Sequence, residues 1–314
     1  MHPPLRRPSA RQRLLLLAPR AGVAGLAAAL VHALAGCAGG DAASAPDITA
    51  APAPTSPAPT AASSSSNAVP ADPQPPGVET IEIEGALDHV HGIVVTDEGT
   101  LLLGTHTGVA ALTTDGTLTR VGDGRDDHMG MSGIPGTSRL VSSGHPGPGS
   151  ALPNPVGLLT SDDGGRTWRP VSLTGAVDFH ALATDGTRVV GFDGRAGLLV
   201  SDDAGASFEA GAPIAAAALA FGDEALYATT ADGVQRSTDG GRTFSVVQDA
   251  PPLVLLAAGV DGSLWGVDTA GTAWRSAHGE DWEQRGTVGP VEALGVDDLD
   301  TAYAIEGHRL HVLS

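Results

Sequence analysis

The chain contains no lysine and one cysteine, and only 4% of its 314 residues are aromatic. A single thiol excludes an intramolecular disulfide framework and any zinc site built from several thiolates. Without lysine, 17 arginines face 36 acidic residues. Because phosphate backbones are bound by positively charged surfaces, this balance predicts no nucleic-acid partner. The acidic surplus favours cations as ligands, although it also serves to keep a protein soluble.

Acidic residues are absent from the first 37 positions, which hold five of the 17 arginines. An apolar run follows at residues 21–35 and ends in small residues. A basic segment, an apolar segment and a small-residue cleavage site are the three parts of a secretory signal. The run is shorter than the ~20 residues that span a bilayer, which disfavours a permanent membrane helix. We therefore expect residues 1–36 to be a signal peptide.

The tetrapeptide Leu34-Ala35-Gly36-Cys37 resembles the bacterial lipobox. The resemblance implies that the Cys37 thiol is diacylated and that Cys37 becomes the N-terminus after cleavage. The protein would then be extracytoplasmic and anchored by lipid to the outer face of the cell membrane. The alternative is an ordinary signal peptide or an uncleaved anchor in which Cys37 is incidental. Acylation would leave no thiol for catalysis or for a metal.

Residues 37–77 contain no Leu, Phe, Trp or Tyr and are rich in Ala, Pro, Ser and Thr. Because such a segment cannot bury enough apolar surface to offset its ordering entropy, we predict a disordered linker. The remaining residues, 78–314, are numerous enough for one all-β domain. Short β-type runs separated by turn residues, as at 188–192 and 198–201, indicate strands, and helical periodicity is missing.

Four similar segments begin at Ser161, Ser201, Ser237 and Ser276, which are 40, 36 and 39 residues apart. The first three read Ser-Asp-Asp-Gly-Gly-Arg-Thr-Trp, Ser-Asp-Asp-Ala-Gly-Ala-Ser-Phe and Ser-Thr-Asp-Gly-Gly-Arg-Thr-Phe, and the fourth is degenerate. Spacing of this size is typical of propeller blades.

These segments resemble the Asp-box, or BNR repeat, of sialidases and other β-propellers. The resemblance implies a structural role, in which a carboxylate caps the N–H groups of a hairpin turn and an aromatic ring packs against the blade. The residues in these roles would be the carboxylates Asp163, Asp203 and Asp239 and the rings Trp168, Phe208 and Phe244.

The repeat length divides residues 78–314 into six blades, so the predicted fold is an all-β, six-bladed β-propeller. The last blade begins near residue 291 and has room for only three strands. Residues 78–84 can supply the fourth. Pairing them there would join the two ends of the ring and remove an exposed sheet edge.

A ligand at the mouth of the central tunnel would meet residues that begin the first strand of each blade and residues that end the second. Blade alignment gives His91, Met129, His180, Ala217, Leu256 and Glu292 for the first set, and His106, His145, Asp193, Thr230, Asp268 and Glu306 for the second. Eight of these twelve are histidine or carboxylate, and the histidines fall in the first three blades.

This pattern predicts that the mouth binds a small ligand or a divalent metal such as copper, zinc or calcium. The candidate ligands are His91, His106, Met129, His145 and His180. The alternative is that these histidines are hydrogen-bonded turn residues whose similarity reflects the ancestry of the repeats.

Several strings, among them His89-Val90-His91-Gly92, Gly104-Thr105-His106 and Asp178-Phe179-His180, resemble exported bacterial Asp-box proteins known as sialidase-like or glycosyl-hydrolase-like. The resemblance covers roughly residues 85–245 and implies a propeller at the cell surface.

The same resemblance suggests a glycoside hydrolase, with Asp193, Asp268 and Glu292 as candidate catalytic carboxylates and a glycan as substrate. The chain departs from sialidases because Gly133 stands where their Arg-Ile-Pro motif has arginine, and because the aligned mouth positions hold no arginine. A scaffold or assembly factor for an envelope complex is a third hypothesis. We expect a monomer.

Overall fold

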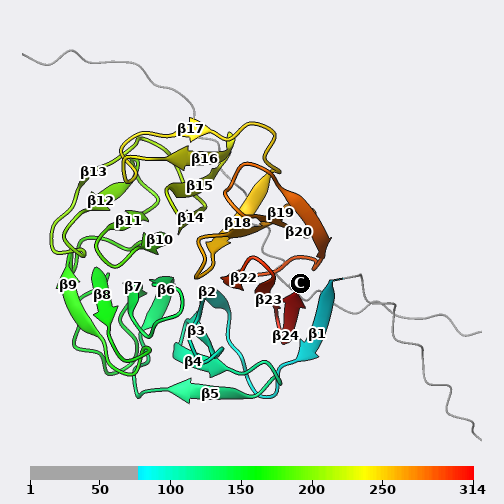
Figure 1. Cartoon of the computed structure of the whole chain (residues 1–314). Helices are drawn as coiled ribbons and strands as arrows, with labels where there is room; N and C mark the ends of the chain where they lie inside the picture. Colours follow the sequence, from blue (N-terminus) through cyan, green and yellow to red (C-terminus); the bar gives the residue numbers. More distant parts are fainter. Residues whose placement is uncertain (1–76) are drawn as a thin grey trace, which may run out of the picture. The chain divides into compact units, whose positions relative to one another are not determined.

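The computed structural model describes residues 77–314, and this region contains 24 β-strands and no helix. The strands form six four-stranded antiparallel sheets, which are arranged as the blades of a ring (Figure 1). The predicted six-bladed, all-β propeller is thus confirmed. The signal peptide, Cys37 and the predicted linker up to residue 76 lie outside the described residues. Since the described part has no helix, it has none that could span a membrane.

Each blade is named by its order along the chain, and its strands run from the tunnel outward. Blade 1 consists of β2 (Val90–Val95), β3 (Leu101–Thr105), β4 (Gly108–Leu112) and β5 (Leu118–Val121). Blade 2 consists of β6 (Asp127–Gly133), β7 (Leu140–His145), β8 (Leu158–Ser161) and β9 (Arg169–Ser172). Blade 3 consists of β10 (Ala181–Thr184), β11 (Val189–Phe192), β12 (Leu199–Ser201) and β13 (Glu209–Ala210).

The second half of the ring repeats this arrangement. Blade 4 consists of β14 (Ala218–Phe221), β15 (Leu226–Thr230), β16 (Gly233–Ser237) and β17 (Ser245–Val246). Blade 5 consists of β18 (Leu253–Ala258), β19 (Leu264–Asp268), β20 (Thr272–Ser276) and β21 (Glu283–Thr287). Blade 6 consists of β22 (Ala293–Asp298), β23 (Thr301–Glu306), β24 (Arg309–Leu313) and β1 (Val78–Glu82).

Blade 6 closes the ring with strands from both ends of the described region. β1 pairs antiparallel with β24, from Val78 opposite Leu313 to Glu82 opposite Arg309, and the two strands lie side by side in Figure 1. The Thr80 Oγ1 and His311 Nδ1 atoms, 3.0 Å apart, add a side-chain hydrogen bond across this pair. The closure predicted from the sequence is therefore present, although β1 ends two residues earlier than expected.

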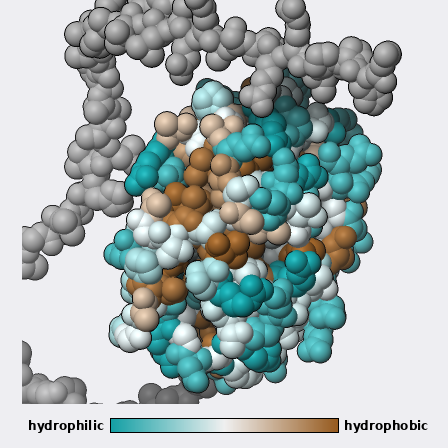
Figure 2. Space-filling view, turned by 90° about the vertical axis from the view of Figure 1, so that its left-hand side faces the viewer, coloured by the Kyte–Doolittle hydropathy of each residue, from teal (hydrophilic) through white to brown (hydrophobic). Residues whose placement is uncertain are grey.

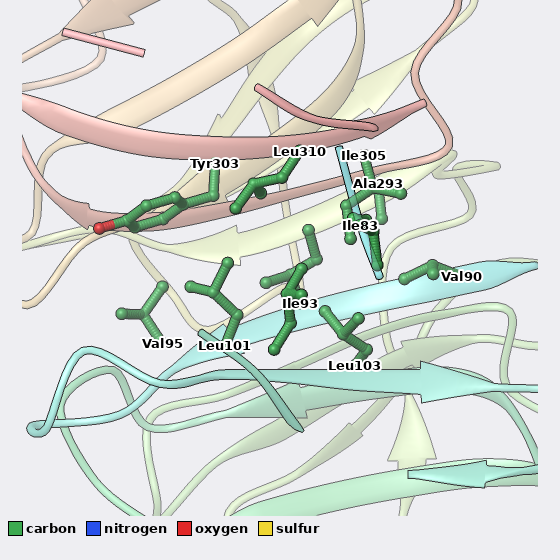
Figure 3. Close-up of a cluster of buried hydrophobic side chains, with 11 residues drawn as sticks. Ile83, Val90, Ile93, Val95, Leu101, Leu103, Ala293, Tyr303, Ile305 and Leu310 are labelled. Atoms are coloured by element: carbon green, nitrogen blue, oxygen red, sulfur yellow. The ribbon is translucent and has the colours of Figure 1, made fainter. Parts of the chain in front are cut away.

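The core lies between neighbouring blades because the inner strands are covered on both faces. Figure 3 shows one such layer, where side chains of blade 1 such as Ile93 and Leu101 meet side chains of blade 6 such as Tyr303 and Leu310. This explains why an inner strand such as β3 is buried at every residue, whereas the outermost strands β13 and β17 are exposed at both of their residues.

The side of the propeller shown in Figure 2 carries polar and apolar residues together. Figure 2 shows the side that lies to the left in Figure 1, where hydrophilic residues surround smaller hydrophobic patches. Among the described residues, Val246, Val254 and Val260 are the exposed large hydrophobic side chains.

The repeat turns, defined as residues 161–168, 201–208 and 237–244, connect the third and fourth strands of blades 2, 3 and 4. In the first, one Asp163 oxygen accepts hydrogen bonds from Ser161 Oγ (2.8 Å) and the Thr167 amide (2.9 Å), and the other accepts from Thr167 Oγ1 (2.6 Å). Asp203 and Asp239 make the same set. These carboxylates therefore hold the turns in shape.

Candidate metal centre

The innermost strands of the six blades surround a central tunnel with a cavity of about 160 Å³. Its wall consists mostly of Ala, Leu, Val and Gly. Within the described region, His91 and His180 are the only titratable side chains of that wall. His91 is the second residue of β2 and His180 directly precedes β10, so both lie at the end of the tunnel where the first strands begin. The titratable groups of the tunnel wall within the described region are therefore at this mouth.

Three potential ligand atoms, from His91, His106 and Asp127, converge at the tunnel mouth. His106 follows β3 in blade 1, and Asp127 begins β6 in blade 2. The distance between His91 Nε2 and His106 Nδ1 is 3.3 Å. Asp127 Oδ1 lies 3.0 Å from the His106 atom and 3.8 Å from the His91 atom. Ligand atoms bound tetrahedrally to zinc at 2.0–2.2 Å are about 3.3–3.6 Å apart. The three separations lie within a few tenths of an ångström of this range, so small side-chain rotations would let the atoms share one ion. All three atoms lie within 4.8 Å of one another.

Proton counting also favours an ion at this point. A neutral imidazole carries one N–H, which can serve only one acceptor at a time. Here His91 Nε2 and His106 Nδ1 face each other and also the same Asp127 oxygen. A cation between the three atoms would accept both nitrogen lone pairs and one carboxylate lone pair, which satisfies every group at once.

Burial keeps His91 in the neutral form that a metal requires. Its side chain is 11% exposed. Burial, followed by the neighbouring His106 and His89 imidazoles, lowers the pKa of His91 to about 4, and Asp127 offsets this only in part. The imidazole of His91 is therefore neutral above about pH 5, with a lone pair free for coordination.

The cluster continues into the neighbouring blades as a chain of alternating imidazoles and carboxylates. His145 Nδ1 lies 3.5 Å from Asp127 Oδ2, and His145 Nε2 lies 3.5 Å from Asp178 Oδ2. His180 Nε2 approaches the same Asp178 oxygen at 3.3 Å. In the other direction, His89 Nδ1 lies 2.7 Å from Glu292 Oε2. Every ion pair of these carboxylates within residues 77–314 is with a histidine.

The structure brings together four of the five predicted ligands, His91, His106, His145 and His180. Met129 is the third residue of β6 and directly precedes Gly130, which pairs with Ser143 after a shift between Asp127 and Gly130. His91 likewise directly precedes Gly92, which pairs with Gly104 after a shift between Val90 and Gly92. Met129 therefore stands in blade 2 where His91 stands in blade 1.

The first strand of blade 5 departs from the expected register. The inner strand β18 begins at Leu253, with a shift in its pairing between Leu253 and Leu255. Leu256 thus lies within the strand and lines the tunnel rather than beginning the strand at the mouth.

The three predicted catalytic carboxylates accept hydrogen bonds from turns. Asp193 accepts from the Arg195 amide at 3.1 Å. Asp268 accepts from the Ala270 and Thr272 amides and from Trp274 Nε1. Burial alone would raise the pKa of Asp268, but these hydrogen bonds outweigh it and lower the pKa. Glu292 accepts from the Val90 and Gly307 amides, both at 3.0 Å, which links blades 6 and 1 beside the histidines.

Sequence reasoning missed Asp127 and Asp178 as members of the site. Both stand two residues before an aligned position, Met129 and His180 respectively, as His89 does before His91. A comparison of the blades at this earlier position would have revealed them. The flanking His128, by contrast, is 2% exposed and hydrogen bonds to Ser142 Oγ at 2.7 Å, so it belongs to the core.

Comparisons with known proteins identify the fold alone. No family model and no curated protein matches the sequence. Similar solved structures include a gluconolactonase from Xanthomonas campestris (14% identity, TM-score 0.55, 78% of this chain and 96% of that chain). A Bacteroides thetaiotaomicron protein of unknown function is similar at 12% identity and TM-score 0.56, over 76% of this chain and 75% of that chain. A GH74 enzyme from Niastella koreensis is similar at 14% identity and TM-score 0.50, over 74% of this chain but 53% of its own. The chain thus has a β-propeller fold, a class that hosts many functions.

Proposed function

We propose that the protein is a metal-binding β-propeller that holds a divalent transition-metal ion at the tunnel mouth through His91, His106 and Asp127. The observation that carries this proposal is the convergence of two imidazole nitrogens and one carboxylate oxygen at separations of 3.0, 3.3 and 3.8 Å. Two nitrogen donors and one oxygen donor suit zinc or copper. Calcium is a poorer fit because it takes six to eight oxygen ligands.

The same geometry supports small-ligand binding at the ion. Three protein ligands leave at least one coordination position for water or an added ligand. The His106 side chain is 42% exposed, and His91 lines the tunnel cavity. A small molecule with a carboxylate, hydroxyl or phosphate oxygen could therefore reach the ion from solvent.

Elemental analysis of the full chain, purified without a histidine tag, tests the metal site. We expect zinc or copper in the wild type. His106→Ala should remove the ion bound at His91, His106 and Asp127, because two protein ligands hold zinc much less tightly than three. The matched control is His308→Ala, since His308 is an exposed histidine outside the cluster. A wild type without bound metal, even after incubation with zinc chloride, would refute the proposal.

We also propose that the protein is a lipoprotein anchored through Cys37, on the strength of the segment Leu34-Ala35-Gly36-Cys37. In detergent phase separation of bacterial cells that express the chain, the wild type should enter the detergent phase. Cys37→Ser should remain in the aqueous phase or keep its uncleaved signal. Aqueous partition of the wild type would contradict lipidation.

A further inference from the structure

The imidazole and carboxylate pair of the proposed metal site recurs one blade further around the ring. His106 follows the second strand of blade 1 and faces Asp127, which begins the first strand of blade 2. His145 ends the second strand of blade 2 and faces Asp178, which precedes the first strand of blade 3. The repeat architecture has therefore built the same donor pair twice on one face.

The second pair also has a third donor. His145 Nε2 and His180 Nε2 approach one Asp178 oxygen, Oδ2, at 3.5 and 3.3 Å. Both separations match the distance of about 3.3–3.6 Å between ligands of a tetrahedral ion. The two imidazole nitrogens lie more than 4.8 Å apart, so they have to turn toward each other to share an ion. The two imidazoles are 42% and 52% exposed, so each can turn about its side-chain bonds to complete the coordination without repacking the core.

Asp178 lacks the hydrogen bonds that satisfy other carboxylates of this face. Its Oδ1 atom is buried and has no hydrogen-bond partner, whereas both oxygens of Glu292 accept from backbone amides. A buried carboxylate oxygen without a partner is costly. A bound cation would neutralise the charge that this carboxylate carries.

We propose that His145, Asp178 and His180 form a second site for a divalent transition-metal ion, so that the mouth holds two ions. This inference rests on the proposed function, because the second site repeats the chemistry of the first. The imidazole of His145 connects the two sites. Its Nε2 faces Asp178, and its Nδ1 faces Asp127 Oδ2, the oxygen that the first ion leaves free. Histidines that bind metals commonly donate their other N–H to a carboxylate in this way.

Equilibrium dialysis of the metal-free full chain against zinc chloride, followed by elemental analysis, tests the second site. We expect two zinc ions per wild-type chain and one in His180→Ala and in Asp178→Asn. His106→Ala should also retain one ion, and the double variant of His106 and His180 should retain none. Asp127→Asn should lose the first ion and weaken the second about 10- to 100-fold, as expected when the carboxylate partner of a ligating histidine is removed.

The outcomes separate this inference from the proposal on which it rests. One zinc ion in both the wild type and His180→Ala would overturn the second site and leave the first intact. Two ions that persist in His180→Ala would also overturn it, and no zinc in the wild type would overturn both sites. The control is His278→Ala, an exposed histidine of blade 5, which should keep two ions. A thermal midpoint of each metal-free variant equal to that of the metal-free wild type will show that the fold is retained.

Discussion

The carboxylate of Asp203 stabilises its turn only while it is charged. It accepts hydrogen bonds from Ser207 Oγ at 2.6 Å, from the Ser207 amide at 2.9 Å and from Ser201 Oγ at 2.7 Å. The Ser207 side chain and amide, followed by Ser201, lower the pKa of Asp203 to about 2. A lowered carboxyl pKa contributes stability above the unfolded-state value of 3.8, and this contribution is lost as the pH falls through about 2.

Asp203→Asn should therefore lower the thermal midpoint at pH 7 by about 2–4 °C. The difference between the midpoints of variant and wild type should narrow between pH 4 and pH 2, where the wild-type carboxylate becomes protonated. Thermal denaturation at pH 7, 4, 3 and 2 measures this difference. Asp232→Asn, at an exposed carboxylate of blade 4, is the control. A gap that stays constant down to pH 2 would contradict this account.

At the site, the sequence predicted the histidines better than their partners. His91, His106, His145 and His180 could be found because they recur at similar places in successive blades, and an imidazole is conspicuous among strand residues. Asp127 and Asp178 were harder to find because 36 acidic residues are spread along the chain. Their sequence signal is the position two residues before Met129 and His180, and the folded geometry shows that both carboxylates face histidines of the tunnel mouth.

At the scale of the strand and turn, the repeat turns also connect blades. Gly205 lies in the turn of blade 3 with a φ of 86°, and a Cβ added to it would collide with the Leu158 side chain of blade 2. The Ser172 hydroxyl of blade 2 hydrogen bonds to the Gly205 carbonyl. This glycine therefore provides both the turn conformation and the close approach of two sheets.

Gly205→Ala should destabilise the protein by about 2–5 kcal/mol, because backbone strain of about 1–2 kcal/mol at positive φ is combined with overpacking of about 1–3 kcal/mol. Gly233→Ala is the matched control, since Gly233 has a φ of 102° but no atom within 4 Å of an added Cβ. It should cost only the backbone strain of about 1–2 kcal/mol. Urea denaturation of both variants gives the comparison. Equal losses would show that contact between the blades adds nothing.

The sequence predicted where strands occur better than it predicted which residues pair between them. Alternation and turn residues are local signals, and they located six blades in the sequence. The bulge in β18 shifts the pairing between Leu253 and Leu255, and it depends on how this strand packs against its neighbours. This is why Leu256 was assigned to a position that it does not occupy.

At the scale of the whole molecule, the ring depends on the pairing of β1 with β24. Val78 is 7% exposed and belongs to the core between blades 5 and 6, and Ile81 packs in the core between blades 6 and 1. Burial of a Val or Ile side chain contributes about 1.5–3 kcal/mol. Without β1, β24 would become an unpaired sheet edge that can bind another chain.

Deletion of residues 78–82 should therefore lower the thermal midpoint by about 10 °C, at 2–4 °C per kcal/mol for a domain of this size. It should also produce oligomers in size-exclusion chromatography. Deletion of residues 60–64, in the predicted linker, is the control of equal length and should leave both properties unchanged. A monomer with an unaltered midpoint after loss of 78–82 would show that closure contributes little.

The pairing of β1 with β24 also determines the order of events during biosynthesis. Val78 and Leu313 are partners, so the ribosome has to translate nearly the whole propeller before the first strand can meet the last. Contacts so distant along the chain are typical of slow folding. The closed ring therefore forms late, when almost the whole propeller has been made. If the chain is exported as we propose, it has that interval in which to cross the membrane unfolded.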